Sequence, residues 1–184
     1  RVDYFLNKGT TRKMMKKSQY KYTFKKLTTR DITDNYISWL NDPIVNQYLE
    51  VRHKKQTKKT VSNYVNSFYR EEEKYIWGVY HDEKMIGTTT LAFFNKEDNS
   101  VEIGLVIGDT DYWGKSASDS AFNFILDFSF NKLKKDSVTG GSYDENIGIV
   151  FTFKKLGFER ERVRSISQDK VAHQWRLTKE RWGG

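Results

Sequence analysis

The chain has 184 residues, of which 37% are hydrophobic and 15% aromatic, so it is long enough for one globular domain with a substantial core. It has no cysteine, which excludes disulfides and thiolate nucleophiles, and its three histidines lack the close spacing of a metal site. No apolar run approaches the ~20 residues that cross a bilayer, and no signal-peptide pattern is present, so we expect a soluble, cytoplasmic protein without a metal.

The net charge of +8 is concentrated at the N-terminus. Residues 1–26 hold nine Lys or Arg and one Asp, which leaves 23 basic and 23 acidic residues in the rest of the chain. We expect residues 1–20 to be a basic arm, disordered or partly foreign to the protein because Met14 and Met15 are plausible start sites, and residues 21–184 to form one domain. The neutral part of the chain, residues 27–184, argues against nucleic-acid binding.

The first half of the chain predicts a strand, two helices and three further strands. Alternating hydrophobic residues indicate a strand over 22–28, and helical spacing of apolar residues follows over 29–42 and 57–73. Pro43, the single proline, is expected to end the first helix. The side chains expected to face the core from the second helix are Val61, Tyr64, Val65 and Phe68.

Three strands are predicted over 75–81, 84–94 and 100–108, and their short joins indicate antiparallel hairpins. The second half of the chain then predicts a helix after residue 116, a strand over 136–143, a helix over 146–158 that Gly157 closes, and a terminal strand pair. This order is that of an α+β protein, with a single mixed, mostly antiparallel central sheet of about seven strands flanked by helices.

The stretch Asp111–Ser120 lies between a predicted strand and a predicted helix and holds Gly114, Lys115 and three serines. One interpretation is that Ser116 or Ser118 caps the helix. The other is that the loop binds a phosphate, because a helix N-terminus offers unpaired N–H groups and small residues allow close approach. These ten residues alone leave both interpretations open.

The wider context favours the phosphate. The segments "EIGLVIGDTDYWGKSASDSAFNFILDFSF" and "VTGGSYDENIGIVFTFKKLGF" resemble the coenzyme-binding half of the Gcn5-related N-acetyltransferases (GNAT), in particular the branch of ribosomal-protein N-terminal acetyltransferases. The similarity extends over about residues 22–182 and includes the element order. It implies the GNAT (acyl-CoA N-acyltransferase) fold and an acetyl-CoA-dependent N-acetyltransferase, in which a primary amine attacks the thioester directly.

The resemblance places acetyl-CoA, as co-substrate, along the fourth strand and the loop after it. Backbone groups of Leu105, Val106 and Ile107 would bind pantetheine where the fourth strand diverges from the fifth, and one N–H there would polarise the thioester oxygen. Asn146 and Phe153 would contact the coenzyme from their helix. The pyrophosphate would lie on the loop residues Trp113, Gly114, Lys115, Ser116, Ala117 and Ser118.

Three positions depart from the family pattern. Ser116 stands where the family usually has Gly, and Ser118 where it has Gly or Ala; Ser fits there unless the backbone requires a positive φ. Phe153 stands where many members carry a Tyr that protonates the leaving thiolate, and Phe cannot donate a proton. We therefore expect weaker coenzyme binding and a different general acid, for which Tyr143, just after the fifth strand, is the candidate.

Glu102 is the candidate base, because an amine arrives as an ammonium ion and must lose a proton before it attacks. It alternates with Val101 and Ile103, so its side chain leaves the opposite face of the strand. A solvent-exposed Glu102 with ordered water as the base is the alternative, and the sequence does not separate the two.

The acceptor side is expected in Ser38–Thr57, which resembles the same segment of acetyltransferases that act on amino sugars. Arg52 is a candidate for binding a phosphate of a nucleotide-linked sugar, Glu50 for orienting the amine, and His53 lies beside them. A solvated polar loop would explain the same residues.

A nucleotide-linked amino sugar is thus the favoured acceptor. The alternatives are a protein N-terminus, as on a ribosomal protein, and a non-catalytic coenzyme- or nucleic-acid-binding module; a homodimer is compatible with each.

Overall fold

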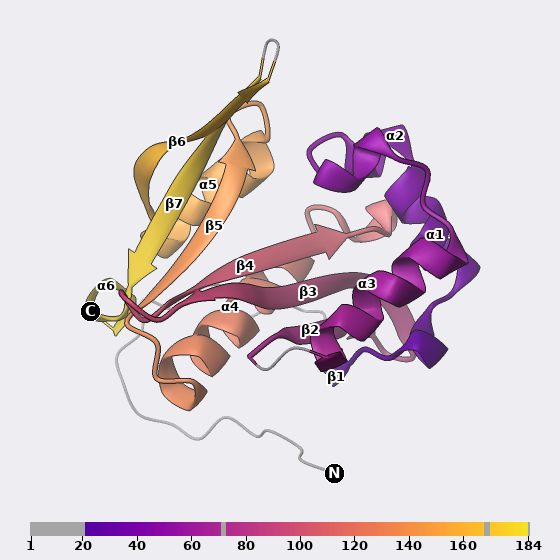
Figure 1. Ribbon diagram of the computed structural model, residues 1–184, viewed down its shortest axis with the longest axis horizontal. Coiled ribbons are helices and arrows are strands. Elements are labelled where there is room, and N and C mark those ends of the chain that lie inside the picture. Colours follow the sequence, from indigo (N-terminus) through magenta and orange to yellow (C-terminus); the bar gives the residue numbers. More distant parts are fainter. Residues whose placement is uncertain (1–20, 71–72, 168–169, 184) are drawn as a thin grey trace.

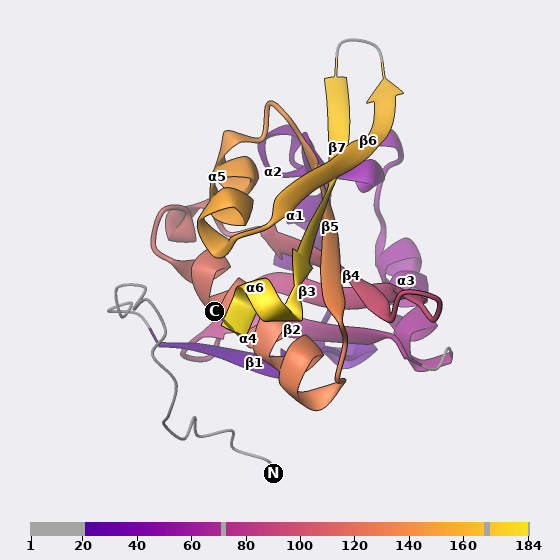
Figure 2. The same cartoon turned by 90° about the vertical axis from the view of Figure 1, so that its left-hand side faces the viewer.

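The computed structural model describes residues 21–70, 73–167 and 170–183, so the expected basic arm at residues 1–20 lies outside the described residues. These residues form a seven-stranded sheet in the order β1-β2-β3-β4-β5-β7-β6, with helices on both faces (Figures 1 and 2). The strands are β1 (Tyr22–Lys26), β2 (Tyr75–His81), β3 (Lys84–Asn95), β4 (Ser100–Ile107), β5 (Ser137–Tyr143), β6 (Glu159–Ser167) and β7 (Lys170–Thr178). The predicted fold class and the predicted antiparallel meander of three strands are confirmed.

Helices of two groups cover the two faces of the sheet. The α-helices are α1 (Asp34–Asn41), α2 (Pro43–Asn46), α3 (Lys58–Arg70), α4 (Ala117–Asp127), α5 (Ile147–Leu156) and α6 (Lys179–Gly183). Short turns are the 3-10 segments η1 (Thr29–Asp31), η2 (Glu50–His53) and η3 (Thr110–Tyr112) and the π turn η4 (Phe128–Lys132). Apolar residues of α1 and α3 form one core cluster with β2 and β3, whereas α4 and α5 form another with β3, β4, β5 and β7.

The first predicted helix differs from the structure. Thr28 caps the 3-10 turn η1, the chain then extends, and Thr33 caps α1 through a hydrogen bond from the Tyr36 N–H. Pro43 does not simply end a helix, because it is the first residue of α2, where a missing N–H costs nothing and its fixed φ suits the helix. Hydrophobic periodicity alone suggests one helix here. The chain instead forms two helical segments, η1 and α1, each capped by a threonine that accepts an N–H.

Two further expectations were wrong in detail. Tyr64 is only partly inward, since the residue is 49% exposed although its hydroxyl reaches Thr90 of β3. The last strand is expected over 170–182 but is shorter: β7 ends at Thr178 and residues 179–183 form α6. Gly157 closes α5 as predicted, with a left-handed φ of 88°.

The sheet opens between β4 and β5, the one parallel pair. These strands are paired only from Ser100 to Glu102, opposite Ser137 to Thr139, and β4 continues for five more residues without β5 beside it. Figure 1 shows β5 rising away from β4 together with β6 and β7. Gly140 and Gly141 lie in β5 just beyond the last pair. The opening leaves backbone groups on one edge of β4 free to bind something other than β5.

Candidate functional site

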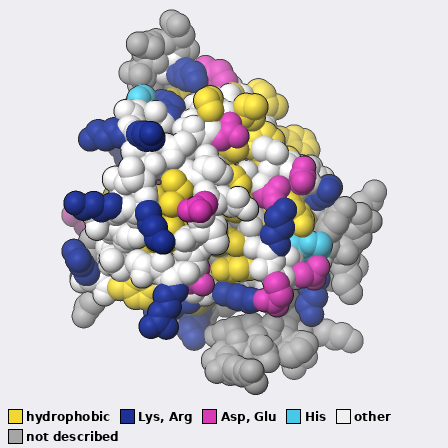
Figure 3. All heavy atoms as spheres, turned by 90° about the vertical axis from the view of Figure 1, so that its right-hand side faces the viewer, with side chains coloured by type: hydrophobic (Ala, Val, Ile, Leu, Met, Phe, Trp, Pro, Cys, Tyr) yellow, Lys and Arg dark blue, Asp and Glu magenta, His cyan; other side chains and the backbone are white. Residues whose placement is uncertain are grey.

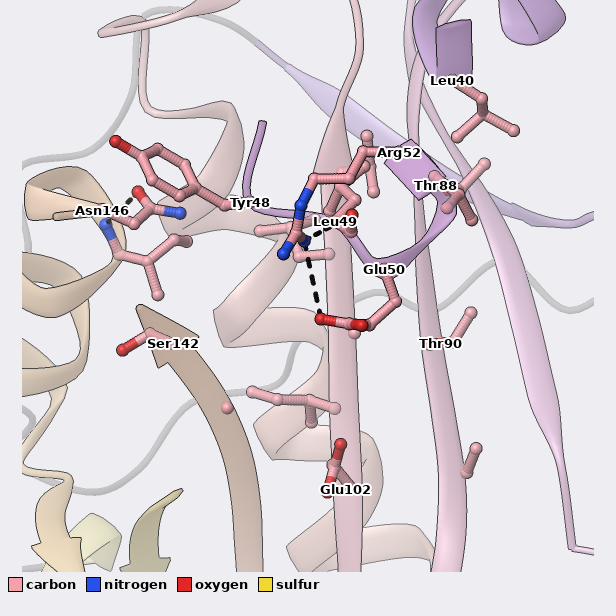
Figure 4. Close-up of a pocket in the computed structure, with 18 of the residues that line it drawn as sticks. Leu40, Tyr48, Leu49, Glu50, Arg52, Thr88, Thr90, Glu102, Ser142 and Asn146 are labelled. Atoms are coloured by element: carbon pink, nitrogen blue, oxygen red, sulfur yellow. Dashed lines mark hydrogen bonds and ion pairs between the residues drawn. The ribbon is translucent and has the colours of Figure 1, made fainter. Parts of the chain in front are cut away.

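A cavity of about 820 Å³ fills the opening between β4 and β5 and extends under η2. Nine of the candidate site residues line it: Glu50, Arg52, His53, Glu102, Leu105, Val106, Tyr143, Asn146 and Phe153. Figure 4 shows Glu50 and Arg52 on their turn above the two strands that carry Thr88, Thr90 and Glu102. Segments far apart in the sequence thus meet at one site.

The floor of the cavity is a polar strip of the sheet on the α1 and α3 side. Thr88 and Thr90 of β3 lie opposite Val106 and Gly104 of β4, and all four line the cavity. An added Cβ at Gly104 would lie 2.5 Å from the Thr90 hydroxyl, so any larger residue at this position would clash with that hydroxyl.

Two tyrosine hydroxyls reach the same strip. Tyr36 of α1 hydrogen-bonds Thr88 and Tyr64 of α3 hydrogen-bonds Thr90. Burial raises the pKa of both tyrosines, more than these bonds lower it. Both groups stay neutral near pH 7, so the strip offers hydroxyls and no charge.

Glu102 faces this cavity from β4, as its alternation with the buried Val101 and Ile103 predicts. Its Oε1 accepts a 2.7 Å hydrogen bond from Arg164 of β6. The guanidinium passes Gly141, where an added Cβ would lie 2.7 Å from the Arg164 Nη1. Arg164 thus fixes the orientation of the carboxylate. The sequence did not suggest this residue, because the order of strands that brings it near Glu102 is not visible in local patterns.

Tyr143, Glu50 and Arg52 form one hydrogen-bonded group across the cavity mouth. The Tyr143 hydroxyl donates to Glu50 Oε1 at 3.0 Å and accepts from Arg52 Nη2 at 3.0 Å. The Arg52 guanidinium also lies 5.1 Å from the Tyr143 ring centroid. Tyr48 adds a fourth link, since its hydroxyl donates to the Glu145 carbonyl at 3.1 Å. The η2 turn is therefore bound to the end of β5 rather than solvated on its own.

The free edge of β4 and the helix α5 carry the residues expected to contact the coenzyme. Leu105 and Val106 line the cavity where β4 lacks a neighbour. The Asn146 side chain caps α5 by accepting from the Ile149 N–H at 3.4 Å, and its amide also faces the cavity (Figure 4). Phe153 is 2% exposed and packs against other core rings. It is a fixed apolar wall.

Seven of the expected coenzyme residues do not line this cavity: Ile107 and Trp113–Ser118. They follow the end of β4 and lead into the N-terminus of α4. The Trp113 indole donates to the Ile107 carbonyl at 2.8 Å, and the Lys115 carbonyl accepts from the Tyr22 hydroxyl at 2.8 Å. The loop is thus fixed to β1 and β4.

The backbone of this loop suits a bound anion better than a capped helix. Gly114 has a φ of 73° and an added Cβ there would meet no atom within 4 Å. Ser116 occupies the N-cap position with a φ of 64°, and its side chain makes no capping hydrogen bond. Asp119, whose charge would repel a phosphate, pairs with Lys155 of α5 at 2.8 Å. The loop therefore keeps N–H groups and an open approach for a negatively charged group.

The cavity's charges are balanced and a basic segment borders it. The acidic residues that line it, Glu50 and Glu102, each pair with an arginine, at 3.6 Å to Arg52 and 2.7 Å to Arg164. From residue 52 to residue 59 the chain has no acidic residue, and its four lysines are exposed. On the face of the molecule seen in Figure 3, basic side chains follow the left-hand edge, and others lie along the lower border and on the right. The acceptor side of the cavity is thus neutral inside with a basic border.

Within the described part of the chain, no helix is long and apolar enough to cross a membrane. Nor do three or more His, Asp or Glu side chains of those residues gather as a group that could hold a metal ion.

Comparisons with known proteins point to one family. Residues 21–159 match the family described as "Acetyltransferase (GNAT) domain". A Bacillus subtilis (strain 168) protein named "Probable N-acetyltransferase YjcK" is 26% identical over 109 residues, 58% of this chain. The match spans 59% of that protein, less than two thirds of its length.

Solved structures share the fold. A spermidine N-acetyltransferase from Vibrio cholerae, in complex with CoA and spermine, superposes with a TM-score of 0.74 at 18% identity, covering 88% of this chain and 97% of that one. An acetyltransferase (GNAT family) from Bacillus anthracis superposes with a TM-score of 0.73 at 18% identity, covering 89% of this chain and 98% of that one.

Proposed function

Because the chain belongs to the acetyltransferase (GNAT) domain family, we propose that it moves the acetyl group of acetyl-CoA to a primary amine of a small molecule, a nucleotide-linked amino sugar. The observation that carries the choice of acceptor is the charge balance of the cavity. Both carboxylates are neutralised by arginines, the floor offers uncharged hydroxyls, and the border is basic. Hydroxyls suit a sugar, and the basic border suits its diphosphate.

A polyamine such as spermine is the competing acceptor, because a solved relative binds it. A polyamine carries several positive charges and needs carboxylates in excess of cations. In the cavity, Glu50 and Glu102 are matched by Arg52 and Arg164, and the exposed Lys54 and Lys55 lie in the chain between His53 and Gln56, which line the cavity. The electrostatics therefore disfavour this acceptor.

The donor site fits acetyl-CoA. The loop Gly114–Ser118 and the N-terminal N–H groups of α4 would hold the pyrophosphate, and the free edge of β4 at Leu105 and Val106 would bind the pantetheine amides. The coenzyme supplies an activated thioester. An N–H on this β4 edge would donate to the thioester oxygen as negative charge develops there. Phe153 closes the site against water from the α5 side.

Proton transfer is assigned to two residues on opposite sides of the opening. Glu102, which Arg164 orients, would take the proton of the acceptor ammonium. Tyr143, whose hydroxyl donates to Glu50 in the free protein, would turn that proton from Glu50 to the leaving thiolate. Arg52, which donates to the same oxygen, would stabilise the phenolate that remains. Thiolate is a tolerable leaving group near neutral pH, so the base matters more than the acid.

A thiol-release assay tests the proposal. The full chain is incubated with acetyl-CoA and, separately, with UDP-linked amino sugars, spermidine, spermine and peptides with a free N-terminus. Thiol release and N-acetylated product are expected with the amino sugars. Preferential acetylation of a polyamine or of a peptide N-terminus would move the substrate class to that acceptor, and no product with any amine would support a non-catalytic binding module.

A further inference from the structure

Phe93 lies at an irregularity of β3 that brings it to the rim of the cavity. Along β3, Thr88, Thr90 and Ala92 face the cavity and Leu91 faces the core under α4, as strand alternation requires. Alternation would next place Phe93 in that core. Instead the register shifts between Ala92 and Asn95, so that Phe94 packs with the Leu91 cluster and Phe93 lines the cavity.

The bulge holds Phe93 in a conformation that a large side chain seldom adopts. Its φ is 51°, in the left-handed region, and the residue is 73% exposed. Because the residue is so exposed, packing of the Phe93 ring in the free protein does little to offset the backbone strain. Bulges and residues with positive φ are concentrated beside functional sites, where they direct a side chain.

The neighbours of Phe93 place it beside Glu102, the proposed base. Ala92, the preceding residue, is the register partner of Glu102. Phe93, Glu102 and Arg164 all line both the large cavity and a second pocket of about 210 Å³ on its outer side. An acceptor whose amine reaches Glu102 would therefore have its next atoms near the Phe93 ring.

We propose that Phe93 is a specificity-determining residue, whose ring packs against the apolar C–H face of the acceptor's sugar ring while the amine lies at Glu102. This inference rests on the proposed function and adds a contact to it. A flat aromatic face at the rim complements the flat face of a sugar ring. A linear amine presents no such face. Discrimination between cyclic and linear acceptors is thus assigned to one exposed side chain.

The test compares three variants in steady-state kinetics with a UDP-linked amino sugar and with spermidine or ethanolamine. Phe93→Ala should raise the KM for the amino sugar roughly 3- to 10-fold, the loss of one aromatic packing contact, with calorimetric coenzyme A affinity unchanged. Phe93→Trp keeps a flat ring and should retain the KM. Phe151→Ala is the matched control, because Phe151 is 67% exposed on α5 and does not line either pocket.

Thermal unfolding separates a functional from a structural role. Phe93→Gly relieves the left-handed strain and should raise the Tm by about 2–4 °C, while the KM for the amino sugar rises as in Phe93→Ala. An unchanged KM in Phe93→Ala, an equal loss with linear amines, or a change of oligomeric state would overturn the assignment. If the unaltered chain acetylates no amino sugar, the proposed function itself fails, and that result is visible before any variant is compared.

Discussion

Ser116 is one of the non-glycine residues whose backbone has a positive φ. Its φ of 64° is a conformation that glycine adopts without penalty and that other residues pay about 1–2 kcal/mol to adopt. Serine stands here where the family usually has glycine, and this substitution matters only if the backbone requires a positive φ. The positive φ meets that condition.

Ser116→Gly should therefore stabilise the protein by about 1 kcal/mol and strengthen coenzyme A binding, because the loop is then relaxed in its binding conformation. Ser118→Gly is the control: Ser118 lies within α4, where glycine costs about 0.5–1 kcal/mol. Thermal unfolding and calorimetry of both variants measure the two effects. Destabilisation by Ser116→Gly would show that the serine side chain supports the loop.

Glu102 and Tyr143 should differ in their contribution to catalysis. Glu102→Gln keeps the shape but removes the base, so turnover should fall roughly 10²–10⁴-fold and the acidic limb of the pH–rate profile should flatten. Tyr143→Phe should cost less, mainly at high pH, because thiolate is a tolerable leaving group near neutral pH. Coenzyme affinity should be unchanged in Glu102→Gln. Near-full activity of Glu102→Gln with an unaltered acidic limb would assign the base to water or to Glu50.

At the scale of elements, α1 is connected to β3 by the Tyr36–Thr88 hydrogen bond. Burial raises the pKa of Tyr36, so its contribution to stability is complete below the unfolded-state pKa of about 10 and is lost as the pH rises through the folded-state value. The free energy of unfolding should therefore fall steeply above pH 10. Tyr36→Phe should cost about 1 kcal/mol at pH 7 and make the alkaline decline shallower. Parallel declines in both proteins would show that Tyr36 does not cause it.

Local patterns predicted most elements but not what divides or redirects them. The helix predicted over 29–42 is split because Thr28 and Thr33 each accept an N–H, a competition that hydrophobic spacing does not record. The bulge at Phe93 was not anticipated either, because "LAFF" is compatible with regular alternation of either register. The predicted hairpins and the helix end at Gly157 were correct because short turns and a C-terminal glycine are local signals.

At the scale of the whole molecule, the site could be predicted only where a motif or a resemblance marked it. The coenzyme loop and the β4 residues came from the family pattern. The partners of Glu102 and Tyr143 could not be found, since Arg164 is 62 residues from Glu102 and Glu50 is 93 from Tyr143. Such pairs follow from strand order and from where η2 meets β5, which no window of sequence contains.

The distribution of charge gives a prediction for the chain as a whole. Residues 27–184 have no net charge, and deletion of residues 1–20 removes six Lys or Arg and one Asp, which lowers the net charge from +8 to +3. The deletion should therefore leave acetyl transfer intact and abolish salt-sensitive retention on DNA or RNA. Filter binding at several salt concentrations, with acetyl transfer measured in parallel, checks both parts. Nucleic-acid binding by the shortened chain at physiological salt would contradict the neutral-domain interpretation.

The central claim is that this fold binds acetyl-CoA across the α4 N-terminus and the free edge of β4. Calorimetric titration of the full chain with coenzyme A tests it most directly, alongside a double variant in which Lys115→Glu and Ser116→Leu place a negative charge and a bulky side chain in the loop. The account predicts saturable binding by the unaltered chain and a strong loss of affinity in the variant, with the fold retained by circular dichroism. Equal affinity in the two proteins, or no binding by either, would contradict it.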